Sequence, residues 1–453
     1  MTRMSRVGGC LAVLVAGTVA QAQQPLAQPP TAPAPPTDLI AAPPAVPEGV
    51  VPGPAAGTLG LEQESQPYQQ LLDIAGVSPP PRLGPTPVDQ VGLFRNALGI
   101  GSWLEDRNLR LFGWLETGYT GSTGGSGLQS VQPRLNRYGN EFLVNDLGFA
   151  FQKALRQDRF DWGFNVRYFA GANAALGAAG GGIGDPVENP RFGQDLRDAY
   201  LSFHLPVLTE KGMNVKVGRM NTIIGWNGFL APYRPLYSSD YQFFYSQDGA
   251  FTGFLTQLIV SDRLDVWNGM TLGANTFFET RSRDSYCYIG QINYWLQSDK
   301  RTRLTASTYL GPDAIFAAPG MNGDFVSMVE LRAQHTWGER FTQVIQSNFG
   351  WDRNTPVGTA SWFGVYGLGI LHLTREWDFI SRAEWFRDVG GTRTGVNAHF
   401  SEVTFGLNWH PTPFIEIRPE IRGDFASRPA FGRNNLPTDY TQLSGAISAL
   451  FKF

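Results

Sequence analysis

The sequence is poor in cysteine and in charge, and each shortage excludes a class of protein. It has 2 Cys in 453 residues, and one of them, Cys10, lies close to the N-terminus. With Cys287 alone in the rest of the chain, a disulfide-stapled domain and a thiolate zinc site are both excluded. Only 17% of the residues are charged, whereas a soluble domain carries about 25%. The composition is therefore not that of ordinary soluble domains.

Basic excess and long apolar runs are also missing. The net charge of −3 argues against a nucleic-acid partner. Beyond the N-terminal stretch, no run approaches the ~18 apolar residues that a membrane-spanning helix needs. The chain nevertheless has 13% aromatic residues and 53 Gly. Such a composition without spanning helices fits the other structure that can span a membrane, the closed β-barrel.

The motifs of catalysis, metal binding and phosphate binding are missing as well. The 5 His form no His-Glu-x-x-His pair, and no Gly-x-Ser-x-Gly sequence occurs. The run Gly180–Gly184 lacks the Lys-Ser/Thr of a phosphate-binding loop. A carboxylate such as Glu402 beside a His could form an acid–base pair, but carboxylates accompanied by Arg along strands are more typical of a pore lining. We therefore expect no enzyme, no metal and no cofactor.

The N-terminal region predicts export. Arg3 and Arg6 precede an apolar stretch that ends at Ala20-Gln21-Ala22, which is the pattern of a signal peptide over residues 1–22. Residues 23–60 form a Pro/Ala-rich leader that cannot bury a core and is predicted to be disordered. Residues 61–104 are predicted to form a short helical periplasmic segment. Whether that segment plugs, seats or simply precedes the C-terminal remainder of the chain is left open.

From residue 105 to residue 453 the pattern changes to alternation with period two. In the stretch 413–425 the apolar residues share one face and the charged residues share the other. In a membrane pore the apolar set faces lipid and the charged set faces water. The apolar set is Ile415, Ile417, Pro419, Ile421 and Phe425; the charged set is Glu416, Arg418, Glu420, Arg422 and Asp424.

The alternation predicts an all-β fold, a transmembrane antiparallel up-and-down barrel of about 16 strands (range roughly 12–18). The seventh strand, at 264–276, has the weakest pattern. Links after even strands are short, and links after odd strands are about 9–27 residues long, as tight periplasmic turns and long outer loops are in such barrels. The predicted strands are 109–120, 145–155, 160–170, 196–205, 213–222, 250–260, 264–276, 285–296, 302–310, 325–336, 341–351, 361–373, 377–387, 399–410, 413–425 and 440–453.

Aromatic residues gather beside the short turns, where an interfacial girdle is expected. Trp337 and Phe341 flank one turn, and Trp409 and Phe414 bracket another. The chain ends on an alternating strand that contains Phe451 and Phe453. This ending resembles the signal that the barrel assembly machinery reads in outer-membrane proteins.

Several short motifs occur in order along residues 105–453: Ala199–Phe203, Val215–Arg219 followed by Gly225-Trp226, Val266–Gly269, and the charged strand around Arg418. In this order they resemble the outer-membrane β-barrel porin-2, OmpL-like family. The resemblance implies a pore for small solutes in the outer membrane. Members often have an acidic residue after the Gly-aromatic pair, where this chain has Asn227.

We therefore expect a porin that passes small hydrophilic solutes or ions by passive diffusion, because barrels of about 16–18 strands leave an aqueous channel. The expected partners are outer-membrane lipid, the assembly machinery and the solutes, with no nucleic acid, and a homo-oligomer is left open. The alternatives are a substrate-specific or plugged channel and a structural or adhesive surface barrel.

Inward-facing charges are the candidate pore lining, and we expect Arg418→Glu and Arg422→Glu to fold normally and to shift ion selectivity. The long link 223–249 is expected either to fold into the lumen as a constriction or to cap the barrel outside. The lining candidates are Arg110, Glu116, Arg167, Glu330, Arg332, Arg382, Glu384, Glu416, Arg418, Glu420 and Arg422. The candidates in the link are Tyr233, Arg234, Tyr237, Asp240 and Tyr241.

Overall fold

The structure is a computed structural model, and it describes residues 85, 87–128, 137–178, 191–247, 249–278, 286–312, 325–432 and 436–453. The predicted signal peptide and leader lie outside these residues, as do residues 61–84 of the predicted helical segment. In the part of the chain that is described, no helix is long and apolar enough to cross a membrane.

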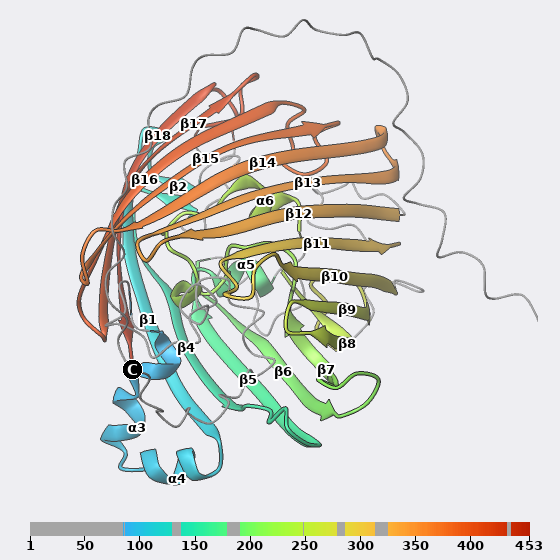
Figure 1. The fold of residues 1–453 in the computed structure, drawn as a ribbon. Helices are drawn as coiled ribbons and strands as arrows, with labels where there is room; N and C mark the ends of the chain where they lie inside the picture. Colours follow the sequence, from blue (N-terminus) through green and yellow to red (C-terminus); the bar gives the residue numbers. More distant parts are fainter. Residues whose placement is uncertain are drawn as a thin grey trace, which may run out of the picture. The chain divides into compact units, whose positions relative to one another are not determined.

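The described strands close into a barrel of 16, in which every neighbouring pair is antiparallel (Figure 1). A short two-stranded sheet, β2 (Gly127–Leu128) with β3 (Tyr138–Gly139), lies in the first long link. The barrel strands are β1 (Leu109–Ser122), β4 (Glu141–Lys153), β5 (Asp161–Gly171), β6 (Gly193–Leu205), β7 (Met213–Asn221), β8 (Ala250–Ser261), β9 (Leu264–Thr271), β10 (Cys287–Trp295), β11 (Thr302–Gly311), β12 (Phe325–Trp337), β13 (Phe341–Thr355), β14 (Gly358–His372), β15 (Trp377–Val389), β16 (His399–Thr412), β17 (Ile415–Ala426) and β18 (Thr441–Lys452).

The predicted fold class and strand number are confirmed, including the seventh strand, which is β9. Links after even strands are short, for example residues 262–263 and 413–414. The link after the eleventh strand contradicts the expected long loop, because residues 356–357 alone join β13 to β14. Thr355 pairs with Gly358 there, and Gly358 has a φ of 85°, which the tight turn requires. The ladder simply continues past the predicted strand ends.

The two faces of each strand separate as the alternation predicts. On β17, Ile421 and Phe425 are 53% and 50% exposed, whereas Arg418 and Arg422 are each 1% exposed. Because successive side chains point to opposite faces, a single register places all the charged residues of this strand inside. The outer face is apolar, as a lipid-facing wall must be.

The last strand closes the barrel against the first. Trp114 pairs with Lys452 across β1 and β18, and the Gly113 N–H donates to the Phe453 carbonyl at 2.7 Å. A Cβ on Gly113 would lie 2.3 Å from the Phe453 ring, so the glycine makes room for that ring. Closure of this kind leaves no unpaired strand edge. The role of Phe451 and Phe453 as an assembly signal stays a prediction.

Aromatic side chains mark the end of the barrel with the short turns. Trp337, beside the β12–β13 turn, is 56% exposed. Trp377 and Trp409 pair in register across β15 and β16 and stack with ring centroids 5.7 Å apart. This arrangement fits the predicted interfacial girdle.

In the described residues before the barrel there are three short helices: α2 (Val88–Val91), α3 (Leu93–Ala97) and α4 (Gly101–Asp106). Figure 1 shows α3 and α4 beside the ends of β1 and β4 that carry the short turns. Helices were predicted in this stretch, and α2, α3 and α4 lie between residues 88 and 106; the periplasmic helical segment over 61–104 stays a prediction. Two further helices, α5 (Ala174–Ala178) and α6 (Tyr241–Tyr245), lie in the links at the opposite end of the strands, as does the 3-10 helix η2 (Ala231–Tyr233).

Candidate functional site

The link from β7 to β8, residues 222–249, folds into the interior of the barrel, and we call it the inner loop. None of its described residues is exposed. It contains η2 and α6, and the Asp240 carboxylate caps α6 by accepting from the Phe243 N–H at 2.7 Å. Burial raises the pKa of Asp240. Of the two expected placements, the inward one is observed.

A buried charge cluster anchors the loop to β1 and β17. Glu116 of β1 accepts from Arg234 of the inner loop through one carboxylate oxygen and from Arg418 of β17 through the other. All three side chains are at most 1% exposed. Arg418 also donates to the carbonyls of Ala231 and Arg234, at 2.9 Å each. One carboxylate therefore links two wall strands and the loop.

A second set of contacts holds the segment around Ser238. Arg382 of β15 donates to the Ser238 carbonyl at 3.0 Å and to Glu402 of β16 at 2.6 Å. Arg422 of β17 donates to the Ser239 carbonyl at 2.5 Å. These guanidinium groups are bound by carboxylates and by loop carbonyls at once, which is the geometry that buried charges need.

Carboxylates on the same wall receive the loop N–H groups. Glu420 accepts from the Tyr237 N–H at 2.9 Å, and Glu384 accepts from the Gln242 N–H at 2.9 Å. The Tyr241 hydroxyl donates to Asp424 at 3.0 Å. Backbone groups of a buried loop must find such partners. The inner face of β15–β17 therefore supplies both acceptors and donors to the loop.

The beginning of the loop reaches a different wall. The Trp226 N–H donates to Gln346 of β13 at 2.9 Å, and its indole N–H donates to Gln334 of β12 at 3.2 Å. Arg332 of β12 donates to the Gly225 carbonyl. On the β4 side, the Ala231 N–H donates to Asp146 at 2.8 Å. The loop is thus anchored on walls formed by strands that are far apart in the sequence.

The sequence-predicted lining residues divide into two groups. Seven of them form hydrogen bonds directly to the inner loop, namely Glu116, Arg332, Arg382, Glu384, Arg418, Glu420 and Arg422. The expectation that Arg418→Glu folds normally is revised. Arg418 donates hydrogen bonds to Glu116 and to the loop backbone. A Glu at position 418 would place a second buried carboxylate against Glu116.

The other four lining candidates pair with charged residues outside the inner loop. Arg167 pairs with Asp198 at 3.1 Å, Glu416 with Lys452 at 3.5 Å, and Glu330 with Arg332 at 3.7 Å. Arg110 is 41% exposed and pairs with Asp89 of α2 at 2.5 Å, at the end of the barrel with the short turns. Whether any of these residues lines a solute path stays a prediction.

The link candidates also find partners in the interior. The Tyr237 hydroxyl donates to Asn145 of β4 at 2.7 Å. Tyr233 is 2% exposed, and the guanidinium carbon of Arg167 lies over its ring, 5.2 Å from the ring centroid. Asn227, where an acidic residue was expected from the resemblance, donates to Asp240 at 3.1 Å. The carboxylate of this region therefore comes from position 240.

Sequence reasoning missed the polar anchors Asn145, Asp146, Gln334 and Gln346. Each lies on the inward side of a strand and is at most 1% exposed. The alternation was an available signal for Asp146, Gln334 and Gln346, whereas Asn145 is buried beside Asp146 because a β-bulge shifts the register of β4 against β1 there. Among the described residues, no group of three His, Cys, Asp or Glu side chains is arranged to hold a metal ion.

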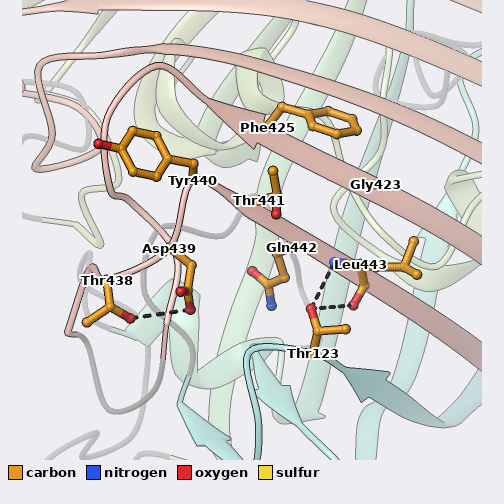
Figure 2. Close-up of a pocket in the computed structure, with 9 residues that line it drawn as sticks. All are labelled: Thr123, Gly423, Phe425, Thr438, Asp439, Tyr440, Thr441, Gln442 and Leu443. Atoms are coloured by element: carbon orange, nitrogen blue, oxygen red, sulfur yellow. Dashed lines mark hydrogen bonds between the residues drawn. The ribbon is translucent and has the colours of Figure 1, made fainter.

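A pocket of about 650 Å³ lies away from the inner loop, at the ends of β17, β18 and β1 (Figure 2). Phe425 and Leu443, which line it, are about half exposed on the outer face of the barrel. The Thr123 hydroxyl is bonded to the Leu443 backbone at this rim, as Figure 2 shows. None of the nine residues that line this pocket belongs to the inner loop.

Comparison with known proteins agrees with this architecture. The family model of beta-barrel porin-2, OmpL-like, matches residues 108–453, and no curated protein matches the chain in sequence. Solved barrels share the fold. The outer membrane channel DcaP of Acinetobacter baumannii is 10% identical with a TM-score of 0.51, over 76% of this chain and 97% of that chain.

Two further solved structures are similar. An anion-selective porin from Comamonas acidovorans is 9% identical with a TM-score of 0.52, over 76% of this chain and 99% of that chain. Pseudomonas putida OprB is 11% identical with a TM-score of 0.52, over 79% of this chain and 97% of that chain. At these identities the likeness shows the fold, whereas the family match spans the whole barrel. The chain therefore belongs to the β-barrel porin-2, OmpL-like family and is a porin-like outer-membrane channel.

Proposed function

We propose that the protein passes small hydrophilic solutes or ions through the barrel by passive diffusion, with the inner loop as its constriction. The observation that carries the proposal is the anchoring of this loop inside the barrel by Glu116, Arg382 and Arg418. A loop held by buried charges narrows the interior without depending on apolar packing alone. Charges of both signs beside it favour polar solutes over apolar ones.

The experiment is ion conductance of the refolded full chain in a planar bilayer, compared with a variant in which a short Gly-Ser linker replaces residues 228–243. The intact protein is expected to show discrete open steps, and the shortened variant larger ones. In the control, Asn-Gly replaces Pro356-Val357 at the β13–β14 turn, far from the inner loop, and the step size should not change.

The outcomes separate the alternatives. If both the intact protein and the shortened variant are silent although folded, as judged by heat-modifiable mobility on a gel, the barrel has a structural or adhesive role. If both conduct equally, the inner loop is not the constriction.

A plugged channel is a second candidate, and one observation favours it. Val88 of α2 is 2% exposed and belongs to one apolar cluster with the inward-facing Phe112 and Trp114 and with Leu230 of the inner loop. Asp89, the next residue, holds Arg110 at 2.5 Å. The segment before the barrel therefore reaches into its mouth. A channel closed by this segment would conduct only after α2 is removed.

A further inference from the structure

The link from β15 to β16, residues 390–398, turns one side chain back into the barrel. Gly390 and Gly391 have φ angles of 91° and 71°, and a Cβ on Gly391 would lie 2.9 Å from the Asn397 nitrogen. This glycine turn reverses the chain directly after β15. As a result Arg393 is only 2% exposed, although it lies in a loop.

The guanidinium of Arg393 rests on an aromatic platform. Its central carbon lies 3.5 Å from the ring centroid of Trp362 on β14. Gly350 of β13 leaves room for the Trp362 ring, because a Cβ at position 350 would lie 2.1 Å from the indole. The stack on Trp362 engages one face of the guanidinium and none of its N–H groups, which have no hydrogen-bond partner in the protein.

A carboxylate orients the loop under this platform. Asp388 of β15 pairs in register with Trp362. One of its oxygens accepts from the Arg393 N–H at 3.1 Å and from the Thr394 N–H at 2.7 Å. The loop is therefore held by its backbone, and the Arg393 side chain is not used to hold it.

Buried polar atoms without a hydrogen-bond partner in the protein gather at this place. They are all three guanidinium nitrogens of Arg393, the indole nitrogen of Trp362, the hydroxyl of Thr392 and the second oxygen of Asp388. Native interiors satisfy almost all such groups. The carboxylates of Asp352 and Asp388 act on the charge of Arg393 through space, without a hydrogen bond to its guanidinium. Burial lowers the pKa of Arg393 to about 10, which leaves it charged at neutral pH.

We propose that this loop and Trp362 form a binding site for small hydroxycarboxylates. Arg393 would hold the solute carboxylate with two N–H groups, and the indole N–H of Trp362 would assist. The free oxygen of Asp388 would accept from the solute hydroxyl. If the site is a stage in solute entry, that role rests on the proposed diffusion function. The binding of solute at the site does not rest on it.

The test is saturation-transfer NMR of glycolate with the full chain refolded in nanodiscs. Glycolate is expected to bind the intact protein saturably, so that excess glycolate competes for the site. Arg393→Gln is expected to weaken this binding roughly tenfold or more. Glycolamide, which lacks the charge, should not bind. Arg387→Gln is the matched control, because Arg387 lies on β15 just before this link, with a half-buried side chain on the face opposite to Asp388, bonded only to the Asp388 carbonyl.

Unchanged glycolate binding in Arg393→Gln would overturn the site, and so would equal loss in Arg387→Gln. A lower unfolding temperature of Arg393→Gln together with unchanged binding would assign Arg393 a structural role instead. Bilayer conductance is measured in parallel. Binding without ion steps supports the site and removes the diffusion function, and ion steps without binding do the reverse.

Discussion

Four buried arginines of this barrel represent two extremes of hydrogen bonding. Arg382, Arg418 and Arg422 on the wall strands have partners at every guanidinium nitrogen, from carboxylates, serines and loop carbonyls. Arg393, in the 390–398 link, is as deeply buried and has no hydrogen-bond partner for its side chain in the protein. The first three hold the inner loop in place, whereas the fourth has its donors available.

Burial of charge therefore does not by itself identify a pore lining. A wall arginine that is fully bonded behaves as a structural element, because removing either partner leaves the other charge unpaired in a poorly solvated place. An arginine whose guanidinium N–H groups have no acceptor in the protein is the better candidate for contact with solute. This difference can be tested by substitutions that target each state separately.

Glu116→Ala is expected to have the largest effect, because it leaves both Arg234 and Arg418 unpaired. Breaking a buried ion pair costs about 3–5 kcal/mol of unfolding free energy. The unfolding temperature on heat-modifiable gels should fall, and conductance should rise as the inner loop loosens. In the control Glu141→Ala, a pair with the largely exposed Arg191 is lost at about 0–1 kcal/mol. Equal effects of the two substitutions would contradict the anchoring role.

Ile417→Arg should come next, because it places a charge one residue from Arg418 but on the lipid side. Ile417 is the third residue of β17 and pairs in register with the girdle residue Trp409, so a lipid-facing Arg there costs less than the roughly 2–4 kcal/mol of a midplane site. The fraction of protein that inserts into lipid vesicles should drop, whereas Ile417→Leu should insert normally. Normal insertion of the Arg variant would mean that this face is not exposed to lipid.

Val88→Asp tests the segment that reaches into the barrel mouth. A carboxylate at a site that is 2% exposed should release α2, because no partner replaces the apolar contacts. We expect a higher conductance with little change in unfolding temperature. Leu93→Asp is the control, since Leu93 is 43% exposed. If both variants conduct like the intact protein, α2 does not obstruct the path.

Arg393→Gln should have a small effect on stability, because no hydrogen bond of its side chain is lost and only the stack on Trp362 is removed. The loss of unfolding free energy should not exceed about 2 kcal/mol, the contribution of a desolvated cation–π contact. Arg422→Gln, which strips Asp424 of its partner, should be clearly less stable. Thermal unfolding in the same nanodiscs makes this comparison. A similar loss in both variants would mean that the two states of arginine do not differ.

Much of the fold could be predicted from local pattern. The strand that carries Ile417 and Arg418 has a period of two, and a side-chain period of two allows only one assignment of faces once the apolar set meets lipid. The strand ends were harder to predict from the sequence. The β13–β14 ladder extends past its alternating core to the turn at Pro356-Val357, where the composition resembles a loop.

The sequence by itself determined the barrel, the strand order and which face of each strand lies inside, because these follow from neighbours one or two residues apart. The tertiary structure alone decided where the inner loop goes and which charges it binds. Glu116 and Arg418 are 302 residues apart, and Arg234 meets both only after β1 and β18 have closed the barrel. Partners at such separations follow from closure, which no local pattern encodes.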